Sequence, residues 1–157
     1  MRALILAAGR GTRISRYLSG KPKCTVDIGN GLCLIRYTVD LLKSRGISDI
    51  GIVLGYRAQV IRDVLKDCQV KFYVNPFYDV TNSIASAWFA RSFVEEAAKA
   101  GEALMIMNGD VYMEEALLDQ ILAEEKSPVM FADETRRETA DYKFFYENGV
   151  LKKYGKE

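Results

Sequence analysis

A glycine-rich turn near the N-terminus is the first feature that can do chemistry. It reads Leu6-Ala7-Ala8-Gly9-Arg10-Gly11-Thr12-Arg13 and directly follows an apolar run. Because glycine has no Cβ, backbone N–H groups in such a turn can close around phosphate oxygens. Thr12 adds a hydroxyl donor, Arg13 adds a planar cation that suits phosphate, and the small Ala7 and Ala8 leave room for a flat base. The alternative is a plain tight turn.

Two common phosphate-binding loops do not match this turn. A Walker loop needs Gly-Lys-Ser/Thr after four spacer residues, and the sequence has no such run. The dinucleotide fingerprint needs a third small residue so that the following helix can pack closely, but Ile14 occupies that position and Pro22 follows soon after. Both assignments are therefore disfavoured.

Two lysines flank a proline a short distance after the turn, in Lys21-Pro22-Lys23. Proline holds its neighbourhood extended and so fixes where the lysines point. A lysine brought near the glycine turn would neutralise a second phosphate. A pair of solvated surface lysines is the alternative, and the spacing from the turn favours the binding role.

A carboxylate follows a strongly apolar segment in Asn108-Gly109-Asp110. Ligands of parallel sheets bind beyond the carboxyl ends of the strands, so a carboxylate placed there points into the ligand cleft. Mg²⁺ is usually held by one or two carboxylates together with substrate phosphates. Asp110 is therefore the expected Mg²⁺ ligand, and a turn or helix cap before Glu114 is the alternative.

A polar segment between a predicted strand and a predicted helix also belongs to this rim, at Asn75-Pro76 through Asn82 and Ser83. The side chains of Asn82 and Ser83 are suited to hydrogen-bonding a base or a ribose. Either residue is equally suited to capping the N-terminus of the following helix, since asparagine and serine are preferred there. Both interpretations stay open.

The composition limits the partners. The 157 residues are 49% hydrophobic and carry 22 Lys plus Arg against 21 Asp plus Glu, a net charge of +1. Such a balance gives no general attraction to nucleic acid or to an anionic membrane, and no apolar run approaches the ~18 residues of a membrane span. The absence of histidine excludes Ser-His and Cys-His catalysis and His-ligated zinc. Three cysteines without CxxC spacing indicate reduced thiols and a cytoplasmic protein.

Apolar strand-like runs alternate with amphipathic segments of helical period along most of the chain. This alternation predicts an α/β fold, a Rossmann-like three-layer α/β/α sandwich with a mostly parallel, mixed sheet. An Asn148-Gly149 hairpin turn is expected between Tyr142–Tyr146 and Val150–Tyr154. The other expected strands are Arg2–Ala7, Asp49–Leu54, Val70–Val74, Ala103–Met107 and Val129–Ala132, and the expected helices are Leu34–Arg45, Arg57–Lys66, one from Asn82 or Ser83 to about Ala98, and Glu114–Ala123.

Together the motifs resemble the sugar-nucleotide pyrophosphorylase-like nucleotidyltransferases. The glycine turn followed by Lys21-Pro22-Lys23 matches the superfamily, and Thr81-Asn82-Ser83 with Asn108-Gly109-Asp110-Val111 is similar to its choline-phosphate cytidylyltransferase branch. The resemblance implies that Arg13 and Lys23 bind phosphates and that Asp110 holds Mg²⁺. It also implies that Lys143 faces the phosphate of the acceptor, and a solvated strand lysine is the alternative. The nucleotide site that follows from the turn and the resemblance comprises Leu6, Ala7, Ala8, Gly9, Gly11, Thr12, Arg13, Lys23, Asn82 and Ser83.

The sequence departs from that family in two respects. The branch commonly has Asn-Asn-Ile-Tyr-Ser-Leu where this chain has Asn-Ser-Ile-Ala-Ser-Ala at 82–87, which weakens the choline assignment. The family resemblance also implies a second metal-binding aspartate in a later part of the protein. We therefore expect residues 1–157 to be a nucleotidyltransferase domain that lacks its C-terminal part and turns over little by itself.

The expected reaction joins an NTP, with CTP favoured by the resemblance, to a phosphorylated small molecule such as phosphocholine or an aminoalkyl phosphonate, and releases pyrophosphate. One alternative is a sugar-1-phosphate nucleotidylyltransferase that uses UTP, dTTP or GTP. Another is a catalytically silent nucleotide-binding domain. The sequence indicates neither the acceptor nor the oligomeric state.

Overall fold

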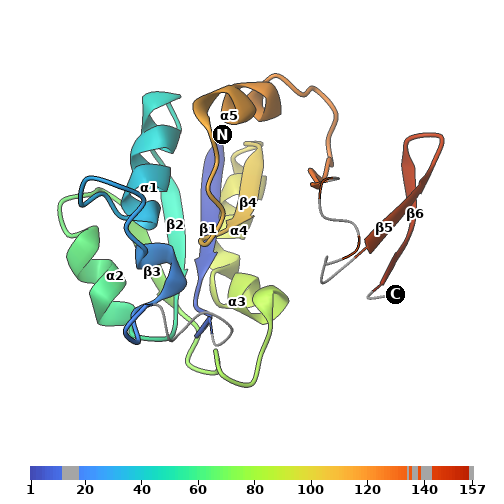
Figure 1. The fold of residues 1–157 in the computed structure, drawn as a ribbon. Coiled ribbons are helices and arrows are strands. Elements are labelled where there is room, and N and C mark those ends of the chain that lie inside the picture. Colours follow the sequence, from blue (N-terminus) through green and yellow to red (C-terminus); the bar gives the residue numbers. More distant parts are fainter. Residues whose placement is uncertain (12–17, 134, 136–137, 139–142, 156–157) are drawn as a thin grey trace. The chain divides into compact units, whose positions relative to one another are not determined.

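The computed structural model describes residues 1–11, 18–133, 135, 138 and 143–155. The chain divides into two compact units, Met1–Glu115 and Ala116–Glu157. A parallel sheet and the helices that follow its strands form the first unit, and a two-stranded hairpin belongs to the second (Figure 1). Among the described helices, none combines the length and the apolar character that crossing a bilayer requires.

The sheet of the first unit has four strands in the order β3-β2-β1-β4, and all of its pairings are parallel. β1 spans Arg2–Ala7, β2 Ile50–Leu54, β3 Lys71–Val74 and β4 Leu104–Asn108. β1 and β2 are central and buried on both faces, which explains their unbroken apolar character. The four expected strands therefore form the mostly parallel α/β architecture that the sequence predicted.

Helices connect consecutive strands, as parallel pairing requires. They are α1 (Leu34–Ser44), α2 (Ala58–Val64), α3 (Ser83–Phe89) and α4 (Arg91–Lys99), and a short 3-10 turn, η2, covers Lys23–Thr25. α1 buries Ile35, Val39 and Leu42, which recur at helical spacing along one side. The prediction of amphipathic helices after β1 and β2 is confirmed.

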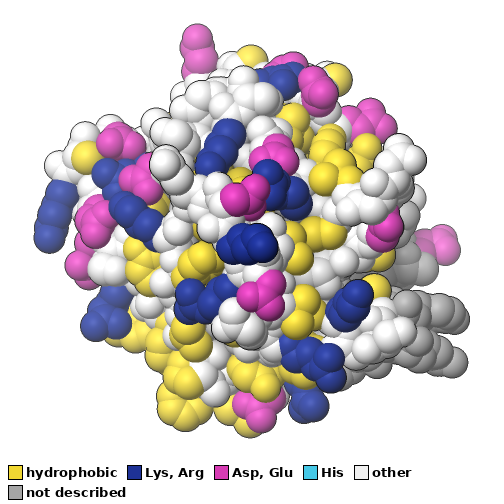
Figure 2. Space-filling model, turned by 90° about the vertical axis from the view of Figure 1, so that its left-hand side faces the viewer, with side chains coloured by type: hydrophobic (Ala, Val, Ile, Leu, Met, Phe, Trp, Pro, Cys, Tyr) yellow, Lys and Arg dark blue, Asp and Glu magenta, His cyan; other side chains and the backbone are white. Residues whose placement is uncertain are grey.

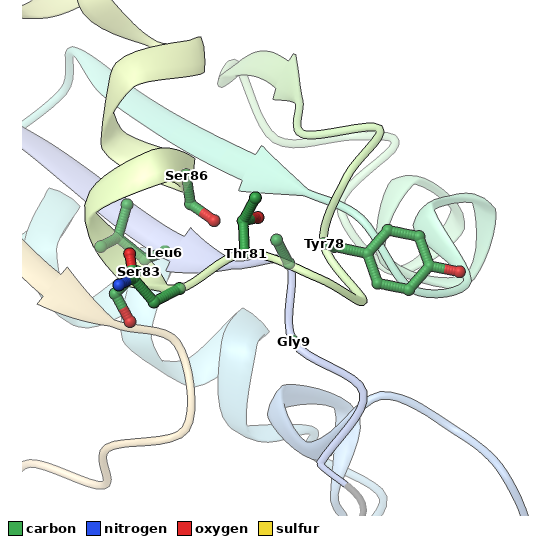
Figure 3. Close-up of a pocket in the computed structure, with 8 residues that line it drawn as sticks. Leu6, Gly9, Tyr78, Thr81, Ser83 and Ser86 are labelled. Atoms are coloured by element: carbon green, nitrogen blue, oxygen red, sulfur yellow. The ribbon is translucent and has the colours of Figure 1, made fainter.

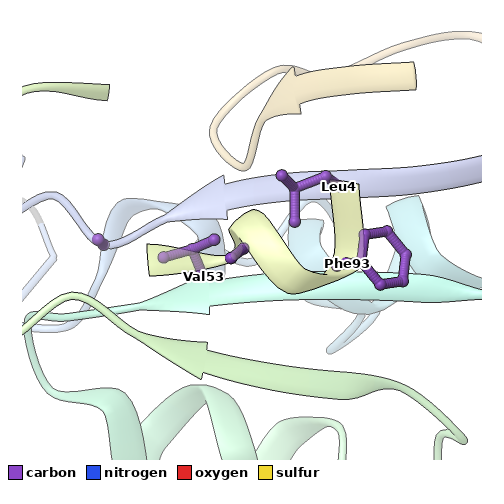
Figure 4. Packing of buried hydrophobic residues seen from close by; sticks show 5 residues of the cluster. Leu4, Val53 and Phe93 are labelled. Atoms are coloured by element: carbon purple, nitrogen blue, oxygen red, sulfur yellow. The ribbon is translucent and has the colours of Figure 1, made fainter. Parts of the chain in front are cut away.

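One face of the sheet packs against α4 through a small apolar cluster. Leu4 of β1 and Val53 of β2 lie beside the fully buried ring of Phe93 from α4, as Figure 4 shows. Gly51 makes this contact possible, because a Cβ there would lie 3.1 Å from Leu4 Cδ1 and 3.2 Å from Phe93 Cδ1. A glycine in the central strand thus lets an aromatic ring approach the sheet directly.

One helix was expected from Asn82 or Ser83 to about Ala98, and this prediction is wrong. The structure has two helices, α3 and α4, that meet at Ala90, whose φ of −104° and ψ of 19° leave the helical region. Neither glycine nor proline marks the break in the sequence. The break instead accompanies tertiary packing, since Ala90 and Phe93 both belong to the buried cluster.

The expected strand at 129–132 is also absent. The described residues there form no strand, and Val129, Met130 and Phe131 are 45%, 46% and 50% exposed. Apolar residues alone do not make a strand, because an isolated strand has no partner for its backbone hydrogen bonds. The prediction of a strand at 129–132 is therefore wrong.

The C-terminal hairpin is confirmed. β5 (Lys143–Glu147) pairs antiparallel with β6 (Val150–Gly155) in the second unit, which also contains most of α5 (Glu115–Leu122). Asn148 and Gly149 have φ values of 50° and 74°. Positive φ at both central residues is the mark of a type I′ turn, for which Asn-Gly is the favoured pair. Tyr142, the expected first residue of the hairpin, lies outside the described residues.

Candidate active site

The glycine turn leaves the end of β1 and is anchored to the strands on both sides of it. On one side the Tyr56 N–H, just after β2, donates to the Ala8 carbonyl at 2.9 Å. On the other side the Gly109 N–H, just after β4, donates to the Leu6 carbonyl at 2.8 Å. The carboxyl ends of three strands are thus held together, and the residues that follow them share one edge of the sheet.

The close approach of β4 to β1 requires Gly109. A Cβ at this position would lie 3.0 Å from the Ala7 Cβ. Ala7 is buried at this junction. Asp110, the residue after Gly109, is exposed to solvent. The glycine between Asn108 and Asp110 therefore positions the carboxylate at the edge of the glycine turn.

Lys23 and Asp110 meet at this edge although 87 positions separate them. Lys23 Nζ lies 3.6 Å from Asp110 Oδ2, and the two side chains are 23% and 46% exposed. The aliphatic part of Lys23 crosses Gly11, where a Cβ would lie 2.7 Å from Lys23 Cε. The structure thus brings the predicted glycine turn, the predicted cation and the predicted carboxylate into one place.

An ion pair that is this open to solvent contributes little to stability. Breaking the pair therefore costs little free energy. The ammonium of Lys23 can then bind a phosphate oxygen, and the carboxylate of Asp110 can bind a metal ion. In the described residues, Asp, Glu and Cys side chains nowhere form a group of three that could hold a metal. Asp110 is the carboxylate at this edge that a metal could use, and Mg²⁺ is usually held by one or two carboxylates together with substrate phosphates and water.

A shallow pocket of about 150 Å³ opens beside the glycine turn (Figure 3). The residues that line it come from the end of β1, the loop after β3 and the start of α3, and they are Leu6, Ala8, Gly9, Tyr78, Thr81, Asn82, Ser83 and Ser86. Pockets for whole drug-sized ligands measure about 300–1,000 Å³, so this one fits a single ring with polar groups around it. A nucleobase has those dimensions.

Asn75 shapes the rim of this pocket, a role that the sequence did not reveal. It is fully buried, and its side-chain Nδ2 donates to Thr81 Oγ1 and Ser86 Oγ, both at 3.0 Å. Its Oδ1 accepts from the Phe77 N–H at 2.9 Å. One side chain thereby connects the end of β3, the loop and α3. The available signal was an asparagine that ends an apolar strand immediately before a proline.

Asn82 and Ser83 lie both at the N-terminus of α3, as helix capping requires, and at the rim of the pocket, as nucleotide binding requires. Asn82 Oδ1 accepts from the N–H groups of Ile84 and Ala85 at 3.1 and 3.4 Å, so Asn82 is the N-cap of α3. Both Asn82 and Ser83 also line the pocket. Capping engages only the oxygen of the asparagine amide, and nucleotide binding by these two residues stays a prediction.

The roles of three other predicted site residues are not tested by the structure. Thr12 and Arg13 lie outside the described residues. Lys143 begins β5 in the second unit, so its assignment to the acceptor phosphate also stays a prediction.

The three cysteines are free thiols. Cys24 directly follows Lys23 and is buried, and this burial raises the pKa of its thiol to about 12, with a smaller contribution from Cys33. The thiol therefore stays protonated at neutral pH. It places no negative charge next to Lys23, which keeps that side of the site suited to an anion.

The surface around the unit carries both signs of charge. Figure 2 shows Lys and Arg side chains interspersed with Asp and Glu over one face of the molecule. No extended field of one sign covers this face, in keeping with the net charge of +1.

Comparison with known proteins identifies relatives along most of the chain. A family model described as the MobA-like NTP transferase domain matches residues 3–152. The CTP:phosphoglutamine cytidylyltransferase of Campylobacter jejuni is 33% identical over 132 residues, which are 83% of this chain and 52% of that protein. A mannose-1-phosphate guanyltransferase of Schizosaccharomyces pombe is 30% identical over 76% of this chain and 33% of its own length.

The structure has similar neighbours among solved proteins. The CTP:phosphocholine cytidylyltransferase of Streptococcus pneumoniae superimposes with a TM-score of 0.60 at 31% identity, over 69% of this chain and 44% of that one. The chain therefore spans about half the length, or less, of the relatives that it matches.

Proposed function

Since the chain belongs to the MobA-like NTP transferase domain family, we propose that it is the nucleotide-binding part of a Mg²⁺-dependent nucleotidylyltransferase. A phosphate or phosphonate oxygen of a small acceptor attacks the α-phosphorus of an NTP. The new P–O bond forms as the bond to the β-phosphate bridging oxygen breaks, and pyrophosphate leaves. The observation that carries the proposal is the meeting of Lys23 and Asp110 across Gly11.

The residues of the site suit this reaction because it needs charge neutralisation rather than proton transfer. A phosphate monoester is mostly dianionic at pH 7, since its second pKa is about 6, so the nucleophile needs no general base. The chain contains no histidine, and this reaction needs none as a general base. Lys23 exchanges Asp110 for an oxygen of the triphosphate, and Arg13 is assigned a second phosphate oxygen. Mg²⁺ bound by Asp110 would supply further positive charge beside the triphosphate.

We propose CTP as the nucleotide. The support is the cytidylyltransferase activity named for two relatives, together with a pocket that has the size of one ring and is lined by Thr81, Asn82 and Ser83. The proposed acceptor is a phosphorylated small molecule such as phosphocholine or an aminoalkyl phosphonate. Transfer to a sugar 1-phosphate is the second candidate, favoured by the similarity to a mannose-1-phosphate guanyltransferase.

A pyrophosphate-release assay over the four common NTPs tests the proposal. The acceptors are phosphocholine, an aminoalkyl phosphonate and mannose 1-phosphate, each with and without Mg²⁺. We expect release from CTP with an amine-bearing acceptor and only when Mg²⁺ is present. Release from GTP or UTP with the sugar phosphate would favour the second candidate, and Mg²⁺-dependent binding of CTP without release from any acceptor would indicate a silent nucleotide-binding domain.

A matched pair of lysine variants shows whether the observed ion pair carries the activity. Lys23→Ala removes the cation at the glycine turn, whereas Lys66→Ala removes an exposed cation that follows α2. We expect Lys23→Ala to weaken CTP binding about ten- to a hundred-fold, the loss of one charge-assisted hydrogen bond. The Lys66→Ala protein should bind as the wild type does, and equal binding by both variants would contradict the proposed role of Lys23.

A further inference from the structure

Two arginines share the ring of Tyr56 at the carboxyl end of β2. Arg10 Cζ lies 5.6 Å from the ring centroid and Arg57 Cζ lies 5.9 Å from it. Tyr56 is held by its backbone and by its side chain. Its N–H donates to the Ala8 carbonyl, and its hydroxyl donates to the Gly20 carbonyl at 3.1 Å. The tyrosine is therefore a rigid platform for two guanidinium groups next to the glycine turn.

No carboxylate of the described residues neutralises these two cations. Neither Arg10 nor Arg57 forms an ion pair within that part of the chain. Arg2 and Arg36 of the same unit do: Arg2 pairs with Asp49, Glu96 and Glu102, and Arg36 pairs with Asp40 and Asp67. Arg62 and Arg91 form no such pair among the described residues either, but each lies over a different ring, so two guanidinium groups on one ring are specific to Tyr56 within that part of the chain. Two positive charges therefore lie together at one place on the sheet edge, and no carboxylate in residues 1–11, 18–133, 135, 138 or 143–155 pairs with them.

The backbone at Arg57 is held in an unfavourable conformation. Its φ of 46° and ψ of 45° are left-handed, which costs a residue with a Cβ roughly 1–2 kcal/mol. Strained residues of this kind concentrate at binding sites, where the fold enforces them. Here the conformation places the guanidinium beside the segment that follows the glycine turn, since a Cβ on Gly20 would lie 3.4 Å from Arg57 Nη2.

We propose that Arg10 and Arg57 bind the two terminal phosphates of the nucleoside triphosphate, the group that leaves as pyrophosphate. This proposal rests on the proposed function and adds a second phosphate subsite to it. Lys23 and Asp110 lie on the β4 side of the glycine turn, and the arginine pair lies on its β2 side. The planar guanidinium matches two phosphate oxygens at once, and the Tyr56 ring keeps both guanidinium groups close to each other.

The terminal phosphates of the nucleotide fit this subsite better than the phosphate of the acceptor does. Arg10 is itself part of the turn whose backbone would close on the triphosphate, between Gly9 and Gly11. The acceptor must approach the α-phosphorus in line, from the side opposite the departing pyrophosphate. A cation pair attached to the turn is therefore on the side of the leaving group.

Calorimetric titration with inorganic pyrophosphate, CTP and CMP tests this subsite directly. The variants are Arg10→Gln and Arg57→Asn, the second because asparagine tolerates a left-handed backbone. We expect each variant to bind pyrophosphate and CTP about ten- to a hundred-fold more weakly, while its affinity for CMP stays unchanged. Thermal melting confirms that the variants are folded.

Arg62→Gln is the matched control. Arg62 also belongs to the α2 region, and its guanidinium also lies over an aromatic ring, with Cζ 4.7 Å from the centroid of Phe72. Its ring, Phe72, belongs to β3, whereas Tyr56 follows the end of β2. We expect its removal to leave all three affinities unchanged.

The outcomes separate this subsite from the proposed function. Pyrophosphate binding that is absent in the wild type, or unchanged in both variants, overturns the proposal. So does a loss of affinity for a phosphate-monoester acceptor, such as phosphocholine, without a loss for pyrophosphate. If pyrophosphate binding depends on both arginines while CTP binds no better than pyrophosphate, the arginine pair stands and the nucleotidylyltransferase assignment fails.

Discussion

Replacing Gly11 by alanine is the sharpest test of how the site is built. Gly11 has a φ of 63°, and a Cβ there would lie 2.7 Å from Lys23 Cε and 2.8 Å from Lys23 Cδ. These separations are too short for real atoms, so the lysine must move. Because its ammonium lies 3.6 Å from Asp110, near the limit of an ion pair, we expect this movement to break the observed pair.

Gly11→Ala is expected to change two quantities, the free energy of unfolding and the affinity for CTP. Alanine in the left-handed region costs roughly 1–2 kcal/mol of the free energy of unfolding. Displacement of Lys23 removes one charge-assisted hydrogen bond to a phosphate, which is worth about ten- to a hundred-fold in CTP affinity. The ion pair itself contributes little to stability, because both of its side chains are partly exposed.

Gly101→Ala separates these two effects. Gly101 follows α4 with a φ of 64°, almost the same as Gly11, but nothing lies within 4 Å of a Cβ built on it. This variant carries the backbone cost without any collision. The two alanine variants should therefore lose similar amounts of stability and differ in binding.

Urea unfolding measures the free energy of unfolding, and calorimetric titration with CTP and Mg²⁺ measures the affinity. We expect both variants to unfold more easily and only Gly11→Ala to lose CTP affinity. Wild-type affinity in Gly11→Ala would refute the placement of Lys23 in the site. An equal loss of affinity in Gly101→Ala would show that general destabilisation, rather than the lysine, is responsible.

Three further predictions concern single side chains. Asn75→Ala should lower the free energy of unfolding by about 1–3 kcal/mol in a urea titration, since it removes the three hydrogen bonds of a fully buried side chain, one of them to the buried Ser86. An unchanged midpoint and slope would contradict a stabilising role for this network. Asp110→Asn should change stability by less than about 0.5 kcal/mol, because the side chain is exposed, yet abolish the gain in CTP affinity that Mg²⁺ provides in parallel titrations; a retained gain would place the metal elsewhere. Cys24 should resist iodoacetamide at pH 8 until the protein is unfolded, since burial raises its thiol pKa to about 12; mass spectrometry of the labelled peptides measures this, and rapid labelling of the folded protein would refute it.

The elements of the fold that the sequence predicts are those whose signal is local. β1 and β2 are apolar at consecutive positions because both of their faces are covered, and the Asn148-Gly149 pair specifies its own turn. The break at Ala90 has no such signal, because it arises where two helices pack separately against the sheet. The prediction of a strand at 129–132 is wrong because a strand needs a hydrogen-bonding partner strand, and local composition does not show whether one is present.

The site divides in the same way. Gly11, Lys23 and Asp110 could be chosen from the sequence because the turn and the carboxylate each follow a strand, and parallel strands end at one edge. Asn75 could not be assigned, because its role depends on three partners around a buried position. The pairing of Arg10 with Tyr56 could not be predicted either, since nothing in the residues between them indicates which ring the arginine meets.

The distribution of charge is consistent with the proposed binding of a highly charged nucleotide by a nearly neutral protein. With 22 basic against 21 acidic residues, the molecule has little long-range attraction for polyanions. At the sheet edge, however, Lys23 and Asp110 neutralise each other, whereas Arg10 and Arg57 have no acidic partner in the described part of the chain. In the proposed function, a triphosphate that carries its own Mg²⁺ would complement both arrangements at once, with the metal at the carboxylate and free oxygens at the cations. A nucleic acid would need positive charge spread over a wide surface, and the mixed charges of Figure 2 do not offer it on that face. The local excess of two guanidinium groups therefore favours a small, compact polyanion over a polymer.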